Sequence, residues 1–142
     1  MKQAQKNVPI GFWIRKADEL LTRNMDQVHQ EADLTRLGWQ LLHTIQDRGI
    51  SQASELLAMV SPFASESEAK EVLASLTKRE LLHWDAHTEG TVGLTLQGEQ
   101  FYRECWEKQQ LIRQKARDGI GETDYQITLQ TLQKIVSNLE KG

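Results

Sequence analysis

The sequence has little cysteine, proline and aromatic content. Its 142 residues include one cysteine, two prolines and 6% aromatic residues. With Cys105 alone, an internal disulfide and a Cys-x-x-Cys metal or redox motif are both excluded. A lone cysteine within a helical apolar pattern is more often a small buried hydrophobic residue than a redox-sensing thiol, so we expect Cys105 to be buried.

Long apolar runs are also missing. No run approaches the roughly 20 residues that a membrane span needs, and the first residues contain no apolar core of a signal peptide. We therefore expect a cytoplasmic protein with no membrane partner. The 39% apolar and 26% charged content is typical of one soluble globular domain.

Sequence signatures of catalysis are lacking too. The chain has no Gly-rich phosphate loop, no nucleophile elbow and no His-Glu-x-x-His motif. The acidic residues are spread along helix faces without a paired constellation. The histidines, at positions 29, 43, 83 and 87, do not have a metal-ligand spacing. These absences argue against an enzyme, and they predict no cofactor and no metal.

The charge balance excludes a simple polycation that coats nucleic acid. The formal net charge is −3, and the isoelectric point calculated from the sequence is about 5.8. DNA binding stays possible, because a local basic face on an acidic dimer is sufficient.

Helical periodicity dominates the first third of the chain. Apolar residues at steps of three and four predict a helix from Val8 to about Ala32 and another from Leu34 to about Asp47. Asp33 is expected to cap the second helix. Gly49 is expected to end it.

The next stretch, from Ser51 to Gly98, is typical of a helix-turn-helix followed by a ribbon. A short helix from Ser51 to about Met59 should end at a Ser-Pro step. Ser65 and Glu68 have the spacing of a capping box and predict the start of a fourth helix. Lys78 and Arg79 are expected to be a solvated pair at the end of that helix.

Two strand-like runs follow the fourth helix, Leu81–Trp84 and Val92–Thr95. A tip containing Gly90 joins them. The order helix, turn, helix and two-stranded ribbon predicts a mainly α fold, a winged helix-turn-helix with flanking dimerisation helices. Such a unit usually binds DNA.

Long amphipathic helices flank the predicted unit. One runs from about Gln97 to Arg117, and the last is expected to begin at Thr123, which has Gln126 at a capping-box spacing. We predict one domain, 1–142, with the DNA-binding unit at 34–96 and dimerisation helices at 8–32 and 97–139. Packing within one chain is the alternative to a homodimer. The predicted dimerisation residues form a heptad seam on the last helix: Tyr125, Leu129, Leu132, Ile135, Val136 and Leu139.

Several short motifs, in their order and spacing, resemble the multiple-antibiotic-resistance regulator (MarR) family of bacterial winged-helix repressors. The resemblance covers nearly the whole chain and implies a homodimer that binds an inverted-repeat operator in double-stranded DNA. It also implies release of the DNA by a small, often aromatic, effector. The motifs are Asp33-Leu34-Thr35 with Trp39 and Leu42, Ser54-Glu55-Leu56, Val72-Leu73-x-x-Leu76-x-Lys78-Arg79, and Leu94-Thr95-Leu96-x-Gly98.

The resemblance also indicates where DNA would bind. The helix that begins at Ser65 would enter the major groove, and the ribbon tip would approach the minor groove. Hydroxyl and ammonium groups at such a helix start can bind phosphates or base edges. The candidate DNA-binding residues are Ser65, Ser67, Lys70, Glu71, His87 and Thr88.

For an effector, the resemblance implies a cavity where the first, second and fifth helices meet. Trp13, Trp39 and His43 are the candidate pocket residues, with ordinary core packing as the alternative.

A second function stays open, in which the winged-helix dimer has lost specific DNA binding and acts through protein or ligand contacts. The family's wing commonly carries an arginine where this chain has His87. Acidic side chains repel phosphates. From Ser65 to Glu80 the chain has four acidic residues (Glu66, Glu68, Glu71, Glu80) against three basic ones (Lys70, Lys78, Arg79).

Overall fold

The computed structural model describes residues 8–85 and 90–141. The predicted mainly α winged helix-turn-helix is confirmed, with its elements in the predicted order. His87 and Thr88 lie outside the described residues. The elements are α2 (Ile10–Glu31), α3 (Arg36–Arg48), α4 (Ala53–Val60), α5 (Glu66–Lys78), β1 (Leu82–Trp84), β2 (Val92–Leu94), α6 (Leu96–Arg117) and α7 (Glu122–Glu140).

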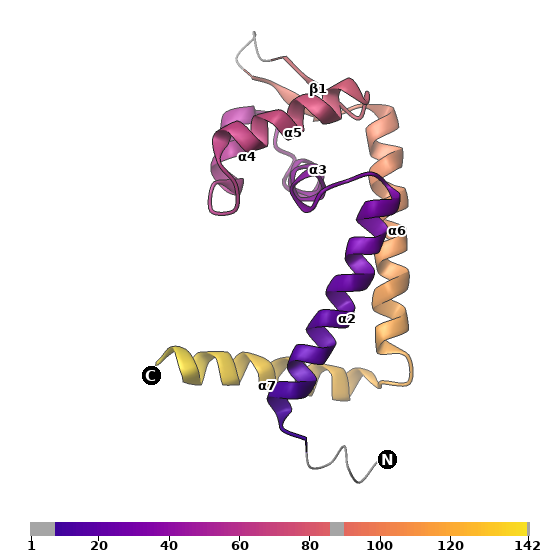
Figure 1. The fold of residues 1–142 in the computed structure, drawn as a ribbon, viewed down its shortest axis with the longest axis vertical. Helices are drawn as coiled ribbons and strands as arrows, with labels where there is room; N and C mark the ends of the chain where they lie inside the picture. Colours follow the sequence, from indigo (N-terminus) through magenta and orange to yellow (C-terminus); the bar gives the residue numbers. More distant parts are fainter. Residues whose placement is uncertain (1–7, 86–89, 142) are drawn as a thin grey trace.

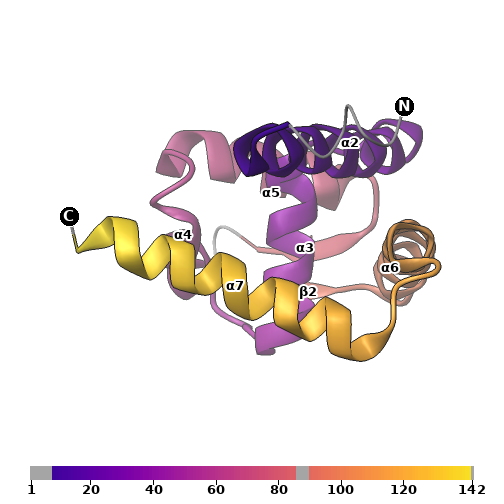
Figure 2. The same cartoon turned by 90° about the horizontal axis from the view of Figure 1, so that it is seen from below.

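The molecule consists of a head, a stalk and a projecting helix. Helices α3, α4 and α5 and the small sheet form the head, while α2 and α6 lie side by side as the stalk (Figure 1). Helix α7 leaves the end of the stalk that is distant from the sheet and extends beyond it (Figures 1 and 2). None of the helices that the structure describes is long and apolar enough to cross a membrane.

The hydrophobic core lies in the head. Its buried stripes come from the three head helices, and the apolar periodicity predicted those of α3 and α5 correctly. In α4 the buried residues are Ala53, Leu56 and Val60. The sheet closes this core from one side with Leu82 and Val92. The largest completely buried side chains are Leu41, Leu42, Val60, Leu56, Leu73, Leu76 and Leu82.

Two of the predicted helix caps are wrong. Thr35, not Asp33, caps α3, because its Oγ1 accepts a hydrogen bond from Gly38 N at 2.9 Å. Asp33 instead has φ 52° and reverses the chain after α2. At α7, Gly121 is the N-cap and Thr123 lies inside the helix. The helix begins earlier than predicted, at Glu122, whose carboxylate forms an ion pair with Arg117.

The capping box at the start of α5 is confirmed. Ser65 Oγ accepts from Glu68 N at 3.1 Å and donates to Glu68 Oε1 at 3.1 Å. The predicted end of α3 is confirmed as well, since Gly49 has φ 63°.

The wing is an antiparallel pair joined to the linker before α4. Trp84 pairs with Val92 in the register of the two strands. Val92 N donates to Ser51 O at 2.9 Å, and Ala53 N donates to Gly90 O at 2.6 Å. These bonds attach the base of the wing to the start of α4, so the helix-turn-helix and the wing form one body.

Candidate nucleic-acid interface

The exposed face of α5 carries three of the predicted DNA-binding residues. Ser67, Lys70 and Glu71 are exposed because the opposite stripe of α5 is buried in the head. The structure brings them together in a shallow groove of about 650 Å³. Trp84 of β1 also lines this groove, together with Glu66 and Ala74.

Sequence reasoning missed Trp84 as a site residue. It was predicted only as part of a strand, but it packs between the base of the wing and the face of α5. Its indole Nε1 is buried and has no hydrogen-bond partner within the described ranges. A large aromatic residue next to the wing tip was the signal that could have indicated this position.

The hydroxyl of Ser65 has a structural role. It is committed to Glu68 through the capping box. Substitution of an N-cap serine by alanine typically costs about 1 kcal/mol. The main contribution of Ser65 to a DNA-binding face is therefore to stabilise the start of α5.

Lys70 is paired with an acidic residue of its own helix. Its Nζ lies 2.9 Å from Glu66 Oε1, one helical turn earlier, and both side chains are about half exposed or more, at 49% and 68%. The hydrogen bond from Lys70 holds the pKa of the Glu66 carboxyl below its usual range, with the lysine charge adding to the effect. The principal cation of this face is thus partly neutralised.

Arg79 is not the solvated residue that the sequence predicted. Its Nη1 donates to Asp33 O at 2.7 Å and its Nη2 donates to Ala32 O at 3.0 Å. Its guanidinium also lies over the ring of Phe101, 5.3 Å from the centroid. Arg79 therefore turns inward, and the exposed surface of α5 loses a positive charge.

A second candidate site lies where the head meets the stalk. Trp39 and His43 of α3 pack there with Tyr102 and Trp106 of α6, and we call these four residues the aromatic cluster. Trp39 and Tyr102 stack with centroids 5.0 Å apart and planes at 4°. His43 Nδ1 is 2.8 Å from the Tyr102 hydroxyl. His43 also stacks on Trp106 at 5.8 Å.

The aromatic cluster contains two of the three predicted pocket residues, and the pocket itself stays a prediction. It brings Trp39 and His43 together, but Tyr102 and Trp106 were missed. Their separation by four residues on one helix face was a usable signal. Burial raises the pKa of the Tyr102 hydroxyl, with the charge of Asp47 as a second cause, so the phenol stays protonated.

His29 of α2 closes the aromatic cluster on the stalk side. Its ring stacks on Trp39 at 5.8 Å. Gln109 Nε2 lies 3.2 Å from His29 Nε2; in this orientation of the amide, His29 Nε2 accepts and the proton of a neutral ring is on Nδ1. This Nδ1 is buried without a partner in the part of the chain that the structure describes. Burial lowers the pKa of His29, which favours the neutral ring.

Trp13 does not join the other two predicted pocket residues within one chain. It packs edge-on against Phe12 at 5.0 Å and is 40% exposed. At 1.5 Å per helical residue, it lies roughly 24 Å along α2 from His29. Trp13 belongs to the free end of the stalk.

The free end of the stalk and α7 expose many apolar side chains. None of the residues of α7, all of which the structure describes, is buried. All six residues of the predicted seam are at least partly exposed, with Leu139 76% exposed. The large exposed apolar residues of this region are Ile10, Phe12, Trp13, Ile14, Leu20, Leu21, Leu111, Ile120, Ile127, Leu129, Val136 and Leu139.

Cys105 is buried in α6, as expected for a small hydrophobic residue. Burial raises the pKa of its thiol, which disfavours the reactive thiolate. Within residues 8–85 and 90–141 no three His, Cys, Asp or Glu side chains gather in a way that could hold a metal ion.

Comparison with known proteins gives matches at the level of structure. No protein-family model and no curated protein matches the chain. A MarR family protein from Bacillus stearothermophilus superposes with a TM-score of 0.71 at 15% identity, covering 92% of this chain and 93% of that one. A mutant of S. aureus MepR bound to an oligodeoxyribonucleotide gives 0.69 at 16% identity, with 94% and 99% covered.

A third similar structure is a DNA-binding protein from Bordetella bronchiseptica, BpsR. It superposes with a TM-score of 0.65 at 19% identity and covers 89% of this chain and 93% of that one. Its description concerns the regulation of DNA binding by 6-hydroxynicotinic acid. The order of the helices and the wing in this chain agrees with these structures, which match it over nearly its whole length. This chain has the winged-helix fold of the MarR-family transcriptional regulators.

Proposed function

We propose that this protein is a transcriptional regulator, acting as a repressor, that binds an inverted-repeat operator as a homodimer. The observation that carries the proposal is the exposed face of α5, with Ser67, Lys70 and Glu71 in one groove on the outside of the head. The similar structure of MepR, bound to an oligodeoxyribonucleotide, supports a DNA partner for this fold.

The geometry of α5 suits insertion into a major groove. The major groove of B-DNA admits an α-helix. Ala69, Leu73 and Leu76 anchor one side of α5 in the core, so the opposite side is free along the whole helix. The base of the wing lies next to α5, so a contact of the wing with the neighbouring minor groove is part of the same proposal.

To bind DNA, Lys70 has to leave its ion pair with the Glu66 carboxylate and form one with a DNA phosphate. An exposed pair such as Lys70–Glu66 contributes little, because water and salt screen both charges. A phosphate contact releases condensed counterions, which makes this exchange favourable at low salt. Ser67 adds a hydroxyl that can donate to a phosphate oxygen.

The exposed apolar residues of the stalk and α7 support the homodimer. Large apolar side chains left exposed on these helices in a single chain are candidates for burial in an interface. A second copy offers the same surface, and a two-fold axis at the free end of the stalk would pair the two chains through α2, α6 and α7. The two heads would then face two half-sites of an inverted repeat.

Substitutions at Lys70 and Glu66 test the DNA-binding face. We expect Lys70→Ala to weaken operator binding about tenfold and to reduce the slope of log affinity against log salt by about one. Glu66→Gln should strengthen binding several-fold at low salt, because it frees Lys70 and removes a repulsive charge. Electrophoretic mobility shifts with the region upstream of the protein's own gene, at several salt concentrations, measure both effects.

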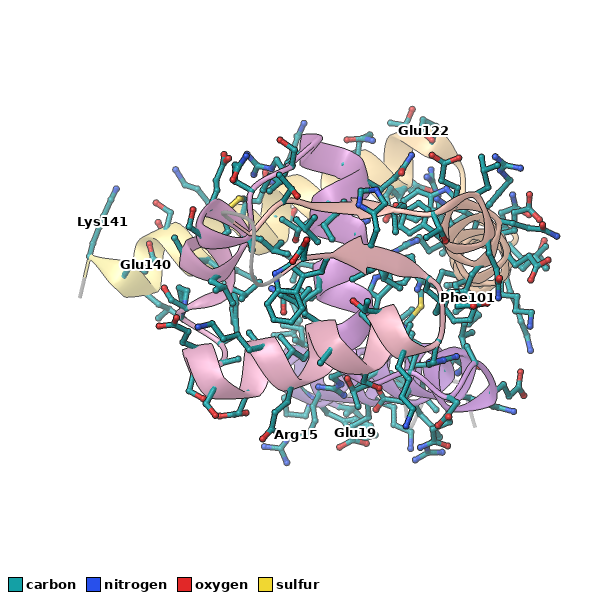
Figure 3. All side chains as sticks on the ribbon, turned by 90° about the horizontal axis from the view of Figure 1, so that it is seen from above. Arg15, Glu19, Phe101, Glu122, Glu140 and Lys141 are labelled. Carbon is teal, nitrogen blue, oxygen red and sulfur yellow. The ribbon has the colours of Figure 1, made fainter. Side chains whose placement is uncertain are left out.

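The matched control for these substitutions is Glu19→Gln. It removes one negative charge, as Glu66→Gln does, but Glu19 lies on α2 and away from α5 (Figure 3). We expect this variant to bind as the parent does. Equal affinities of the parent, Lys70→Ala and Glu66→Gln would show that α5 does not contact DNA.

A second candidate function is favoured by the charge of the same face. Lys70 is paired with Glu66, and Arg79 is turned into the joint between α2 and α3. A face with so little available positive charge also fits a winged-helix dimer that acts through protein or ligand contacts. The absence of any salt-dependent retardation with upstream fragments would favour this second function over the first.

We also propose that the aromatic cluster takes part in binding a small aromatic effector. BpsR, whose DNA binding is regulated by 6-hydroxynicotinic acid, supports this class of ligand. The four rings already cover one another's faces, so a ligand would insert into the stack or bind at its edge near His43 and Tyr102. Either mode would alter the contact between the head and the stalk.

Tryptophan fluorescence with 6-hydroxynicotinic acid as the probe tests the effector site. We expect saturable quenching in the parent, weakened about tenfold by Tyr102→Phe because the hydroxyl that holds His43 is lost. Trp13→Phe should bind the probe with the parent's affinity. No saturable change in the parent, or equal affinity after Tyr102→Phe, would contradict the assignment.

A further inference from the structure

One side chain joins the end of α5 to both helices of the stalk. Arg79 is the C-cap of α5. Its two terminal nitrogens donate to consecutive backbone carbonyls, those of Ala32 and Asp33, at the end of α2. The same guanidinium lies over the ring of Phe101 on α6. Three elements therefore meet at one residue.

The backbone at both helix ends is arranged for this contact. After α2, Asp33 has φ 52°, and Leu34 N donates to His29 O at 2.8 Å. After α5, Glu80 has φ 64°, and Leu81 N donates to Leu76 O at 3.0 Å. Both ends are Schellman motifs, which satisfy earlier carbonyls of the helix and turn the chain sharply.

The carbonyls of Ala32 and Asp33 come after those that the Schellman motif uses. They lie at the negative end of the α2 dipole, where a guanidinium is favourable. Hydrogen bonds from a charged donor are roughly twice as strong as neutral ones. The planar fork of arginine spans two acceptors at once, whereas a lysine ammonium acts as a point charge.

The rest of α5 is attached elsewhere. Along its length α5 packs chiefly on α3, α4 and β1, which all belong to the head. The bidentate pair of Arg36 with Asp26 links only α2 to α3, and its arginine is 69% exposed. The direct contacts of α5 with the stalk are therefore at its C-terminal end, where Arg79 contacts α2 and α6 and Thr95 Oγ1 of the α6 N-cap donates to Glu80 O at 2.6 Å; elsewhere α5 reaches the stalk through α3 and its aromatic cluster.

We infer that Arg79 is a positioning residue that fixes the angle between the DNA-reading helix α5 and the stalk. In a dimer joined through the stalk, this angle sets the separation of the two α5 helices and hence the operator spacing that fits. The consequence for DNA rests on the proposed function. The angle itself is a property of the folded protein without DNA.

Spin-label distances test the angle without DNA. One label is placed on α5 at Ser67→Cys and the other on α6 at Lys108→Cys, in a Cys105→Ala background. Mixing labelled with excess unlabelled chain restricts the measurement to distances within one chain. We expect Arg79→Met, which keeps the apolar stem over Phe101, to broaden the distance distribution. Arg79→Lys should broaden it less, because charge is kept but the fork is lost.

Two controls separate positioning from general loss of structure. Lys78→Met removes the neighbouring exposed cation, and Arg36→Gln breaks the exposed pair at the same joint. Both should keep the parent distribution. Circular dichroism checks that each variant is folded; if Arg79→Met does not fold, Arg79→Lys decides. A parent-like distribution in the folded Arg79 variants would overturn the inference.

The same variants separate this inference from the proposed function. If both hold, Arg79→Met should bind the operator about tenfold or more weakly and should discriminate less between operators of different half-site spacing, while Arg79→Lys recovers part of both. If the parent shows no salt-dependent DNA binding but the Arg79 variants still broaden the distances, the positioning role stands and the DNA-binding proposal fails.

Discussion

Gly98→Ala is expected to destabilise the protein by about 3 kcal/mol or more in the free energy of unfolding. A Cβ added at Gly98 would lie 1.9 Å from the carbonyl oxygen of Leu81, which is backbone and cannot rotate away. The same region is held by the bond from Thr95 N to Leu81 O at 3.2 Å. Relief of the clash would require α6 to move away from β1. Urea unfolding followed by circular dichroism measures the loss.

Gly93→Ala is the matched control. A Cβ at Gly93 would meet the ring of His83 at 2.6 Å, but this ring belongs to an exposed side chain that can swing away. We expect a loss below about 1 kcal/mol, the range of substitutions that need only a surface side chain to move. Equal unfolding midpoints for the two variants would show that the approach of α6 to β1 is looser than the structure indicates.

The second large effect is expected at the seam on α7. The paired substitutions Leu132→Glu and Val136→Glu should convert the proposed dimer to a monomer, raising its dissociation constant at least about 100-fold. Burial of each such side chain contributes about 1.5–3 kcal/mol, and buried unpaired carboxylates add a further penalty. The head should stay folded, because no residue of α7 contributes to its core.

Light scattering and mobility shifts measure this second prediction. The parent should scatter as twice 16.3 kDa and the variant as a single chain of that mass. Operator binding should fall strongly with it, because two linked heads bind far more tightly than one. The control, Gln130→Glu with Gln133→Glu, adds the same charge on exposed positions outside the seam. A monomeric parent at micromolar concentration would refute the dimer.

Local patterns predicted the elements well. The capping box at Ser65 and the glycine at position 49 are correct, because both depend on a few consecutive residues. The two wrong caps have a physical reason. Asp33 and Thr123 are suitable capping residues by type, but the chain reverses at Asp33 after α2, and α7 begins earlier, at Glu122, which pairs with Arg117. The helix starts therefore depend on the turns between packed helices more than on the capping preference of a single residue.

The candidate site was predicted in part. The exposed face of α5 follows from its buried stripe, so Ser67, Lys70 and Glu71 were placed correctly on one surface. The positive charge available on this surface could not be predicted from the sequence. It depends on the Lys70–Glu66 pair and on the inward orientation of Arg79, which are set by side-chain geometry. The operator contacts themselves stay predictions.

The sequence by itself determined the order of the helices and strands, the stripes that α3 and α5 bury and the apolar seam of α7. Periodicity and capping are local properties, and they need no knowledge of neighbouring elements. Only the tertiary structure decided which distant residues meet. It joined Tyr102 to His43, separated Trp13 from Trp39, and placed Arg79 on the carbonyls at the end of α2. Those contacts depend on how α6 and α2 cross the head, which no short pattern encodes.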